Sequence, residues 1–472
     1  MRRTYPILAL ALAAGLAAPQ LLAKGAKLKS HPVAEAQTLD LAKQLIALRS
    51  VQGPGNKTPE ALDVIKGALV TAGWQGSDIE ITPFRDTAYM IATWPGSDPS
   101  LKPLVISGHM DVVEAKPEDW QRDPFTPVVE NGYLFGRGAS DMKYDAALAT
   151  ASLIELRRAG YKPKRTIVLQ FSGDEETTMA SSRVIAEKLK NAELVINIDG
   201  GGGTLDEASG KPLYWTWQGA EKTYDDYQLE VTNAGGHSSA PRPDNAIVQL
   251  AQAVEKVGSY HFQPELSPLT KAYFEKAAQF EKDPKLAAAM RTFAANPGDA
   301  AAAATLRASP SYVGKIGTTC VATMISGGHA QNALPQRATA NINCRVFPGH
   351  NREEIRQQLD QIIGMPMIKV TATSGEDSIS APASPMRPDF IGAVEKAMHL
   401  VNPGLAIFPS QASGASDSMW YRALGVPSYG ASPTFSKDSE DFAHGLNERV
   451  PLSNIAPGIN YYLSLFTDLS AR

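Results

Sequence analysis

The 472-residue sequence predicts an α/β fold, with a mostly parallel central sheet flanked by helices and an inserted α+β domain of ferredoxin-like type. The first observation is that helical segments and short apolar runs alternate through the first third of the chain, which is typical of parallel sheets. The second is a change near residue 218 to alternating, antiparallel-type strands. The third is length, since 472 residues are more than a single domain with one hydrophobic core usually contains. We expect the main domain to comprise residues 30–217 and 368–472, and the inserted domain residues 218–367.

Local signals define the first elements. TPEALDVIKGALVTAG predicts a helix with Thr58 as N-cap, Pro59 at the first position and Gly73 as C-cap. KPLVISGHMD predicts a buried strand that ends in a loop. SDMKYDAALATASLIELRRAG predicts a helix that starts at Ser140 or Asp141. RTIVLQFSGDEE and AELVINIDGGGG predict two further strands, and each ends in acids or glycines.

The predicted inserted domain has its own pattern of strands and helices. KTYDDYQLEVTNAGG alternates as an antiparallel strand does, and DNAIVQLAQAVEKVG and HNREEIRQQLDQIIG predict helices. The Ala-rich residues 263–309 interrupt this pattern, and we expect a helical excursion or a mobile cover there. After about residue 368 the α/β pattern resumes and ends in a helix near INYYLSLFTDL.

The two cysteines lie in predicted strands of the inserted domain. Cys320 and Cys344 are separated by the turn-rich GGHAQNALPQ, and a hairpin centred near Asn332 would place them opposite each other. An oxidising compartment would permit a disulfide. Two buried free thiols are the alternative, and the sequence leaves both readings open.

The N-terminus has the layout of a secretory signal peptide. Arg2 and Arg3 precede an apolar stretch from Ile7 to about Ala18, which is too short to span a bilayer comfortably and is followed by small residues. We therefore expect residues 1–23 to be removed and the protein to be exported, periplasmic or secreted, with no membrane association afterwards. Hydrophobic residues make up 43% of the chain, so a disordered protein is excluded. A net charge of −4 without a long basic run excludes nucleic acid as the main partner.

Acids and histidines gather where the predicted strands end. Ligands of α/β sheets bind beyond the carboxyl ends of strands, and imidazoles with carboxylates suit zinc or a similar divalent ion. FSGDEETTM places three carboxylates side by side, and a bound cation would offset their repulsion. Asp174 fits a structural turn better than a site. The candidates are His109, Asp111, Asp141, Glu175, Glu176, Asp199 and His444.

Seven motifs in order resemble the co-catalytic zinc peptidase family of glutamate carboxypeptidase, carboxypeptidase S, the β-Ala-His dipeptidases, aminoacylase and succinyl-diaminopimelate desuccinylase. They are GHMDVV, WQRDPFTPVVENGYLFGRGASDMK, SGDEE, NIDGGGG, GGHSSAP, MISGGHAQNALPQ and HGLNERV, and they cover nearly the whole mature chain. The long second motif and GGHSSAP are most similar to the branch of carboxypeptidase S and the N-acyl-amino-acid hydrolases.

The resemblance implies two divalent metal ions, zinc first, with cobalt or manganese accepted by the same ligands. His109 and Asp199 would hold one ion, Glu176 and His444 the other, and Asp141 would bridge them. Asp111 would hydrogen-bond His109. Glu175 would be the general base, because a carboxylate that does not ligate a metal must take the proton of the attacking water.

The resemblance also implies roles for the inserted domain. His237 of GGHSS would stabilise the oxyanion, often from a partner subunit. Arg345 would grip a substrate carboxylate, and Asn332 and Gly414 would contact substrate. This arrangement implies a homodimer through the inserted domain, although the insertion at 263–309 counts against it.

The expected function is an exported metal-dependent exopeptidase or dipeptidase that hydrolyses an amide bond beside a free carboxylate. Aspartate at position 199 matches the dipeptidases and aminopeptidases, whereas the long motifs match carboxypeptidase S. An N-acyl-amino-acid deacylase would use the same chemistry on a different substrate. A non-catalytic exported binding protein is the third reading, but such a protein need not keep a general base at Glu175.

Overall fold

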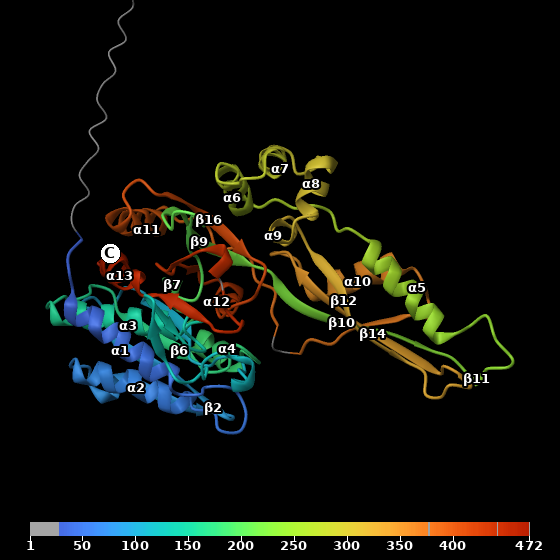
Figure 1. Cartoon of the computed structure of the whole chain (residues 1–472), viewed down its shortest axis with the longest axis horizontal. Helices are drawn as coiled ribbons and strands as arrows, with labels where there is room; N and C mark the ends of the chain where they lie inside the picture. The colour runs from blue at the N-terminus through green and yellow to red at the C-terminus, as the bar shows by residue number, and fades with distance from the viewer. Residues whose placement is uncertain (1–27, 376–377, 441, 472) are drawn as a thin grey trace, which may run out of the picture.

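The computed structural model describes residues 28–471 except 376, 377 and 441, so the predicted signal peptide at 1–23 lies outside the described residues. A ten-stranded mixed sheet forms the centre of the larger body (Figure 1), in the order β1-β2-β6-β3-β7-β17-β9-β8-β18 with β16 beside β9. The neighbours β6, β3, β7 and β17 run parallel, as predicted. The strands are β1 (Ile79–Phe84), β2 (Thr87–Trp94), β3 (Leu104–His109), β6 (Ile167–Ser172), β7 (Leu194–Asn197), β8 (Gly202–Leu205), β9 (Pro212–Glu221), β16 (Ala406–Ala412), β17 (Ser428–Gly430) and β18 (Phe435–Ser436).

Helices cover both faces of this sheet. Because successive strand side chains point to opposite faces, Leu104 and Ile106 of β3 join one core and Val105 joins another. The larger core includes α1 (Pro32–Ile46), α2 (Thr58–Thr71), α3 (Lys143–Arg158), α11 (Pro388–Val401) and α13 (Ile455–Ser470). The smaller core includes α4 (Ala180–Lys188) and α12 (Ser418–Ala423).

Two predicted helix starts differ from the structure. In α2 the Asn56 side chain accepts hydrogen bonds from the backbone and hydroxyl of Thr58, so Thr58 is the first helical residue rather than the cap. α3 begins at Lys143, after the predicted start at Ser140 or Asp141. The N–H groups of Ser140 and Asp141 bond a side chain from elsewhere in the chain, which holds both residues in a loop before the helix.

A second, four-stranded sheet has the order β12-β14-β10-β15 and is entirely antiparallel. Its strands are β10 (Thr223–Thr232), β12 (Thr319–Gly327), β14 (Arg337–Val346) and β15 (Lys369–Ala372). α5 (Ala246–Ser259) and α10 (Arg352–Ile363) pack on one face and share a core with β10 and β14. The boundary expected at 367/368 is wrong at this end, because β15 follows it and still pairs with β10.

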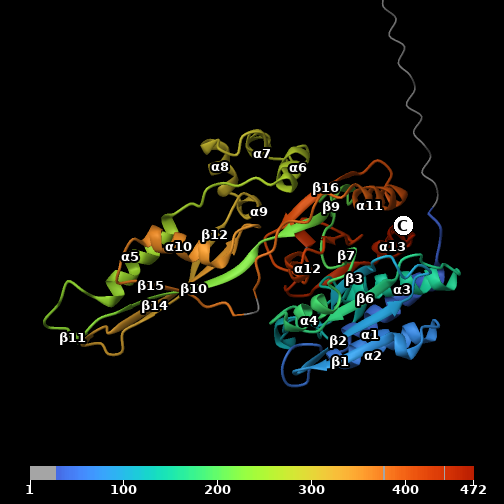
Figure 2. The same ribbon diagram turned by 180° about the vertical axis from the view of Figure 1, so that it is seen from behind.

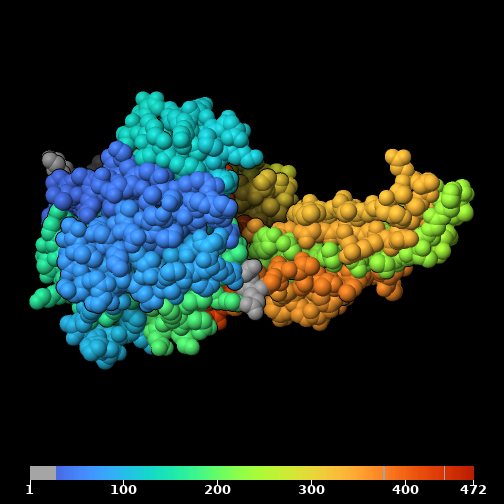
Figure 3. All heavy atoms as spheres, turned by 90° about the horizontal axis from the view of Figure 1, so that it is seen from below, coloured from blue at the N-terminus to red at the C-terminus, as the bar shows by residue number. Residues whose placement is uncertain are grey.

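The second sheet extends away from the larger body as an elongated arm (Figure 3). At the end of the arm, β11 (Gly236–His237) pairs with β13 (Ala333–Leu334). Within the described residues, no helix is long and apolar enough to cross a membrane.

The Ala-rich insertion is helical, as expected. It forms α6 (Pro268–Ala277), α7 (Pro284–Ala295), α8 (Ala300–Arg307) and α9 (Pro310–Val313). Its apolar core includes Phe293 of α7 and Phe408 of β16, and Tyr214 of β9 packs against this core. The insertion therefore packs on β9 and β16 of the large sheet.

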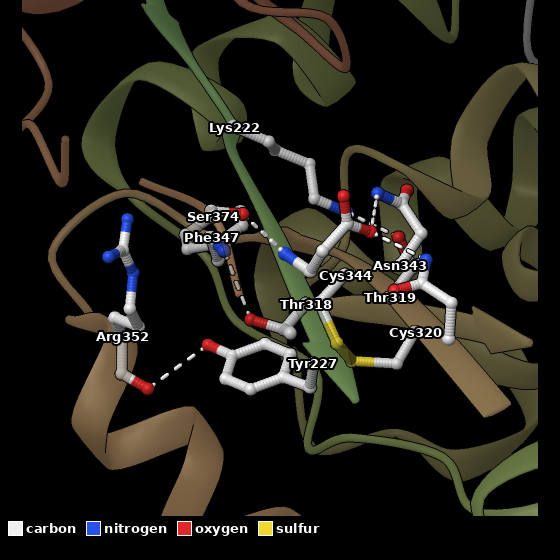
Figure 4. Close-up of a disulfide and its surroundings, with 12 residues drawn as sticks. Lys222, Tyr227, Thr318, Thr319, Cys320, Asn343, Cys344, Phe347, Arg352 and Ser374 are labelled. Atoms are coloured by element: carbon white, nitrogen blue, oxygen red, sulfur yellow. Dashed lines mark hydrogen bonds between the residues drawn. A yellow bond between two sulfur atoms is a disulfide. The ribbon is translucent and has the colours of Figure 1, made fainter. Parts of the chain in front are cut away.

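Cys320 and Cys344 are paired in the register of β12 and β14 and form a disulfide (Figure 4). The free-thiol alternative is therefore wrong. Tyr227 of β10 lies beside the bridge in the same core.

A small sheet of β19 (Arg449–Pro451), β5 (Tyr133–Phe135) and β4 (Val128–Glu130) joins the C-terminal region to the loop before α3. Single turns of 3₁₀-helix lie at Gly76–Asp78, Pro117–Asp119, Asp438–Glu440 and Leu452–Asn454. The pairing of β19 with β5 brings two distant chain segments to the same edge of the large sheet.

Candidate active site

The predicted ligands meet at the carboxyl edge of the central parallel strands. His109 is the last residue of β3, Glu175 and Glu176 follow β6, and Asp199 follows β7. Since β6, β3 and β7 are neighbours that run in the same direction, their ends lie side by side. The topology of the sheet alone therefore brings these side chains together.

Asp141 lies between two imidazole rings. Its Oδ1 is 3.0 Å from Nε2 of His109, and its Oδ2 is 3.2 Å from Nε2 of His444. Asp199 Oδ2 lies 3.7 Å from the same nitrogen of His109, and Glu176 Oε2 lies 2.9 Å from that of His444. Each imidazole thus faces Asp141 and one further carboxylate, with Asp141 in the bridging position.

These residues fit a divalent metal ion. Ligand atoms of His109, Asp141 and Glu176 all lie within 4.8 Å of one another. Oε1 of Glu176 is buried and has no hydrogen-bond partner in the described part of the chain. A buried carboxylate oxygen without a partner is costly unless a cation binds it. Imidazole and carboxylate donors in one cluster suit Zn²⁺ and related ions.

The pKa shifts within the cluster also favour a bound cation. Burial by itself would lower the pKa of His109, but the surrounding carboxylates, Asp199 foremost, raise it well above the usual range. Hydrogen bonds to Asp141 and Glu176 raise the pKa of His444 to about 10. Burial raises the pKa of Glu175 well above its usual range, and Asp199 adds to the shift. The site therefore concentrates negative charge that a metal ion would balance.

Asp111 acts differently from expectation. His109 Nδ1 lies 3.0 Å from the main-chain carbonyl of Asp111, whereas the Asp111 carboxylate is 3.6 Å from that nitrogen, beyond hydrogen-bonding distance. The carboxylate instead accepts hydrogen bonds from the backbone N–H groups of Glu175 at 3.1 Å and Glu176 at 3.0 Å. Asp111 therefore fixes the loop that carries both glutamates.

Asp174 is structural, as predicted. Its carboxylate accepts hydrogen bonds from the N–H groups of Ala180 and Ser181, both 3.0 Å, at the start of α4. The Thr178 hydroxyl donates a third bond of 2.6 Å. These bonds satisfy otherwise free N–H groups of the helix terminus.

Glu448 is not among the residues that the sequence predicts for the site. Its fully buried carboxylate accepts hydrogen bonds from the N–H groups of Gly138, Ser140 and Asp141, at 3.0, 2.7 and 3.0 Å. It also pairs with Arg137 at 2.6 Å. Glu448 lies in the HGLNERV motif, four residues after His444, but nothing local to that motif identifies a partner more than 300 residues away.

A cavity of about 580 Å³ joins the cluster to the arm. Its wall includes Glu175, Glu176 and His444 on one side, Arg345 of β14 on the other, and Gly414 between α12 and β16. The Arg345 guanidinium lies 4.8 Å from the centre of the Tyr224 ring, which also lines the cavity. Predicted metal-binding and substrate-binding residues thus share one cleft.

His237 and Asn332 are not part of this cleft. His237 pairs with Ala333, and the Asn332 carbonyl accepts a 3.0 Å hydrogen bond from Ser238 N. Both residues are exposed, and they lie at the tip of the arm (Figure 2), remote from the ends of β3, β6 and β7. A single chain therefore leaves them far from the metal ligands.

Residues 105–468 match peptidase family M20/M25/M40. The chain is 26% identical over 388 residues to a probable carboxypeptidase S-like 2 of Dictyostelium discoideum, covering 80% of this chain and 73% of that protein. It is 28% identical over 382 residues to the N-fatty-acyl-amino acid synthase/hydrolase PM20D1 of Xenopus tropicalis, covering 78% and 73%. It is 26% identical over 451 residues to Aminoacylase-1 of Mus musculus, covering 93% and 97%.

Solved structures share the fold at low sequence identity. The M20 family metallo-carboxypeptidase Sso-CP2 of Sulfolobus solfataricus has a TM-score of 0.69 at 18% identity, covering 91% of this chain and 98% of that one. The dipeptidase Dug1p of Saccharomyces cerevisiae has a TM-score of 0.64 at 18% identity, covering 93% and 97%.

Proposed function

The chain belongs to peptidase family M20/M25/M40, and from this premise we propose that it is an exported metal-dependent exopeptidase, of dipeptidase or carboxypeptidase type, that hydrolyses an amide bond beside a free carboxylate. One observation carries the proposal: Glu175, Glu176, His444, Arg345 and Gly414 line the same cavity. A carboxylate held by Arg345 would leave the neighbouring amide facing the metal ligands.

Two divalent ions, zinc first and cobalt or manganese as alternatives, are the proposed cofactors. His109 and Asp199 would hold one, Glu176 and His444 the other, and Asp141 both, in line with the contacts that each imidazole makes. Ions in these positions would supply Lewis acidity toward a carbonyl oxygen and lower the pKa of a nearby water.

Glu175 is the proposed general base. Its backbone is fixed by Asp111, its side chain lines the cleft, and the neighbouring Glu176 takes the metal-facing position. Adjacent residues on one loop can thereby divide the two tasks. Glu175 would take a proton from the attacking water and pass it to the leaving nitrogen.

Arg345 and Gly414 are proposed to recognise the substrate carboxylate. A guanidinium presents a planar set of donors that matches a carboxylate in two parallel hydrogen bonds. The stacked Tyr224 ring would restrict the guanidinium to the cleft wall. Glycine at position 414 lets a ligand approach the backbone closely, because it has no side chain. A Cβ added there would have no atom of this chain within 4 Å, so the space beside Gly414 is open.

A homodimer through the arm is proposed because His237 and Asn332 cannot serve the metal cluster of their own chain in this arrangement. β12 is an edge strand of the second sheet and exposes Val321, Met324 and Ile325, with 58%, 71% and 64% of their surface accessible. An exposed apolar edge is a natural pairing surface for a second copy. A partner would then supply His237 as the oxyanion donor.

N-acyl-amino-acid hydrolysis is the second candidate. The names of two relatives, an N-fatty-acyl-amino acid synthase/hydrolase and an aminoacylase, favour it. The chemistry would be the same, and only the acyl side of the substrate would differ. The complete ligand set beside Glu175 argues against a non-catalytic binding protein.

A substrate panel tests the function. Zinc-loaded protein should hydrolyse dipeptides or N-acyl amino acids with a free carboxylate, and removal of metal by a chelator should abolish turnover until zinc returns. Failure of every such compound with metal bound would reject the proposal and favour a binding protein. Export would be tested by N-terminal sequencing of protein recovered outside the cytoplasm, where an intact residue 1 would contradict cleavage after residues 1–23.

A further inference from the structure

A second cavity, of about 440 Å³, lies on the other side of the metal ligands. Asp141 and Asp199 line it, whereas Glu176 and His444 line the cleft that contains Arg345. The ligand cluster therefore stands between the two cavities. If the substrate carboxylate lies beside Arg345, the acyl side of the scissile amide must extend into the second cavity, which we call the acyl-side pocket.

The wall of the acyl-side pocket is polar. Its lining is dominated by the glycine run at residues 200–203 and by short hydroxyl side chains, among them Ser140, Thr216 and Thr434. Such a surface offers hydrogen bonds rather than the continuous hydrocarbon that would accept a fatty acyl chain. The composition of the pocket therefore favours a short, polar acyl group.

Asp145 is one of the charged residues that line the pocket, together with Asp141, Asp199, Glu440 and Arg449. It lies in the first turn of α3, lines the pocket and is only 5% exposed. The hydroxyls of Ser432, at 3.2 Å, and Thr434, at 2.9 Å, both bond its Oδ1. Neither bond uses Oδ2, and within the described part of the chain no lysine or arginine forms an ion pair with Asp145.

Burying a carboxylate without a nearby cation costs free energy, and for Asp145 this cost is seen as a raised pKa. Burial raises its pKa to about 7, and the neighbouring carboxylates Asp199 and Asp141 add to the shift. Asp199 and Asp141 are candidate metal ligands, so a bound metal ion would neutralise their charge. Asp145 would still lack a positive partner.

We propose that Asp145 binds the free amino group of the substrate, so that the acyl side of the scissile amide is an aminoacyl residue and the preferred substrates are dipeptides rather than N-acyl amino acids. This inference rests on the proposed function and narrows its substrate class. The ammonium of a dipeptide lies one carbon beyond the scissile carbonyl, which directs it from the metal ligands into the acyl-side pocket. The hydroxyls on Oδ1 would hold the carboxylate with Oδ2 available for the ammonium.

Matched substrates test the proposal. Ala-X and propionyl-X differ only by the ammonium group, and octanoyl-X adds an apolar chain; X would be Leu, Asp and Lys in turn. Zinc-loaded wild type should show a kcat/KM for Ala-X at least about tenfold above that for propionyl-X, since a hydrogen bond to a charged group is worth about that factor or more. Octanoyl-X should be no better than propionyl-X. A preference for octanoyl-X would overturn the inference while leaving the proposed function intact.

Asp145→Asn keeps the shape and removes the charge. It should lower kcat/KM for Ala-X about tenfold or more and change propionyl-X by less than about threefold. Glu193→Gln is the matched control, because Glu193 bonds Arg387 near the start of β7, away from the pocket, and its loss should not alter the ratio. Equal losses on both substrates in Asp145→Asn would reject the specific contact.

A binding measurement distinguishes a failure of the amino-group site from a failure of the proposed hydrolytic function. Calorimetry with metal-loaded Glu175→Ala measures Ala-X and propionyl-X without turnover. Tighter binding of Ala-X that disappears in Glu175→Ala/Asp145→Asn supports the amino-group site even if no compound is hydrolysed by the wild type. Equal binding of the two compounds overturns it. If Asp145→Asn does not fold, as judged by thermal melting, the Ala-X to propionyl-X ratio of the wild type still decides the question.

Discussion

The backbone N–H of Asp141 donates a 3.0 Å hydrogen bond to the carboxylate of Glu448, a residue that follows it by 307 positions. The same carboxylate holds Ser140, and Arg137 connects Glu448 to the carbonyls of His444 and Gly445. One buried ion pair thus fixes both the proposed bridging carboxylate, Asp141, and the loop that carries a proposed histidine ligand, His444.

Glu448→Gln should weaken metal binding about 10- to 100-fold, which is typical for loss of a group that orients metal ligands. An amide retains one oxygen acceptor but loses the charge that pairs with Arg137, so the loops would be held less firmly. Zinc affinity measured by competition with a chromogenic chelator checks this.

Glu130→Gln is the control for that measurement. Glu130 also bonds an arginine, Arg122, but it lies on β4 and 43% of its side chain is exposed, so its loss should leave zinc affinity unchanged. Wild-type zinc affinity in Glu448→Gln, with the fold intact, would contradict a positioning role.

Glu175→Ala should bind both metal ions as the wild type does and lose about 10²- to 10⁴-fold in kcat, because it removes the general base but no proposed ligand. Metal content by elemental analysis and initial rates on the same preparation measure the two effects. Loss of an ion together with activity would show that Glu175 is a ligand and that the division of tasks with Glu176 is wrong.

The sequence could predict that candidate ligands gather in one place where each of them lies at or after the end of a strand. His109, Glu176 and Asp199 could be grouped because each lies at or shortly after the end of a buried strand, and the parallel order of those strands brings their ends together. Asp174 was also correctly separated from its neighbours. These assignments depend on local pattern and on a rule of topology.

Contacts between distant segments could not be predicted in this way. Glu448 has no local signal, because its partners at 137–141 come close only when β19 pairs with β5. The same contacts delay the start of α3 to Lys143. β15 was assigned to the wrong domain because four residues, Lys369–Ala372, show too short an alternation to reveal their pairing with β10.

The disulfide gives a stability prediction. Cys320 and Cys344 close a loop with a sequence separation of 24, for which chain entropy predicts about 3 kcal/mol of stabilisation. Reductant should therefore lower the melting temperature of the wild type, measured by circular dichroism with and without a thiol. In Cys320→Ser/Cys344→Ser the reductant should have no effect. A wild-type melting curve unchanged after confirmed reduction would contradict a stabilising role.

Arg345→Ala should raise KM for substrates with a free carboxylate at least about tenfold and leave KM for the matching C-terminal amides nearly unchanged. The guanidinium lines the cleft beside Glu175 and His444, and its charge-assisted, two-bond contact can form with a carboxylate but not with an amide. Arg345→Lys should recover part of the loss, since a point charge remains while the planar pair of donors is gone. Steady-state kinetics on acid and amide pairs measure the effect. Equal changes in KM for both members of a pair would show that Arg345 does not recognise the carboxylate.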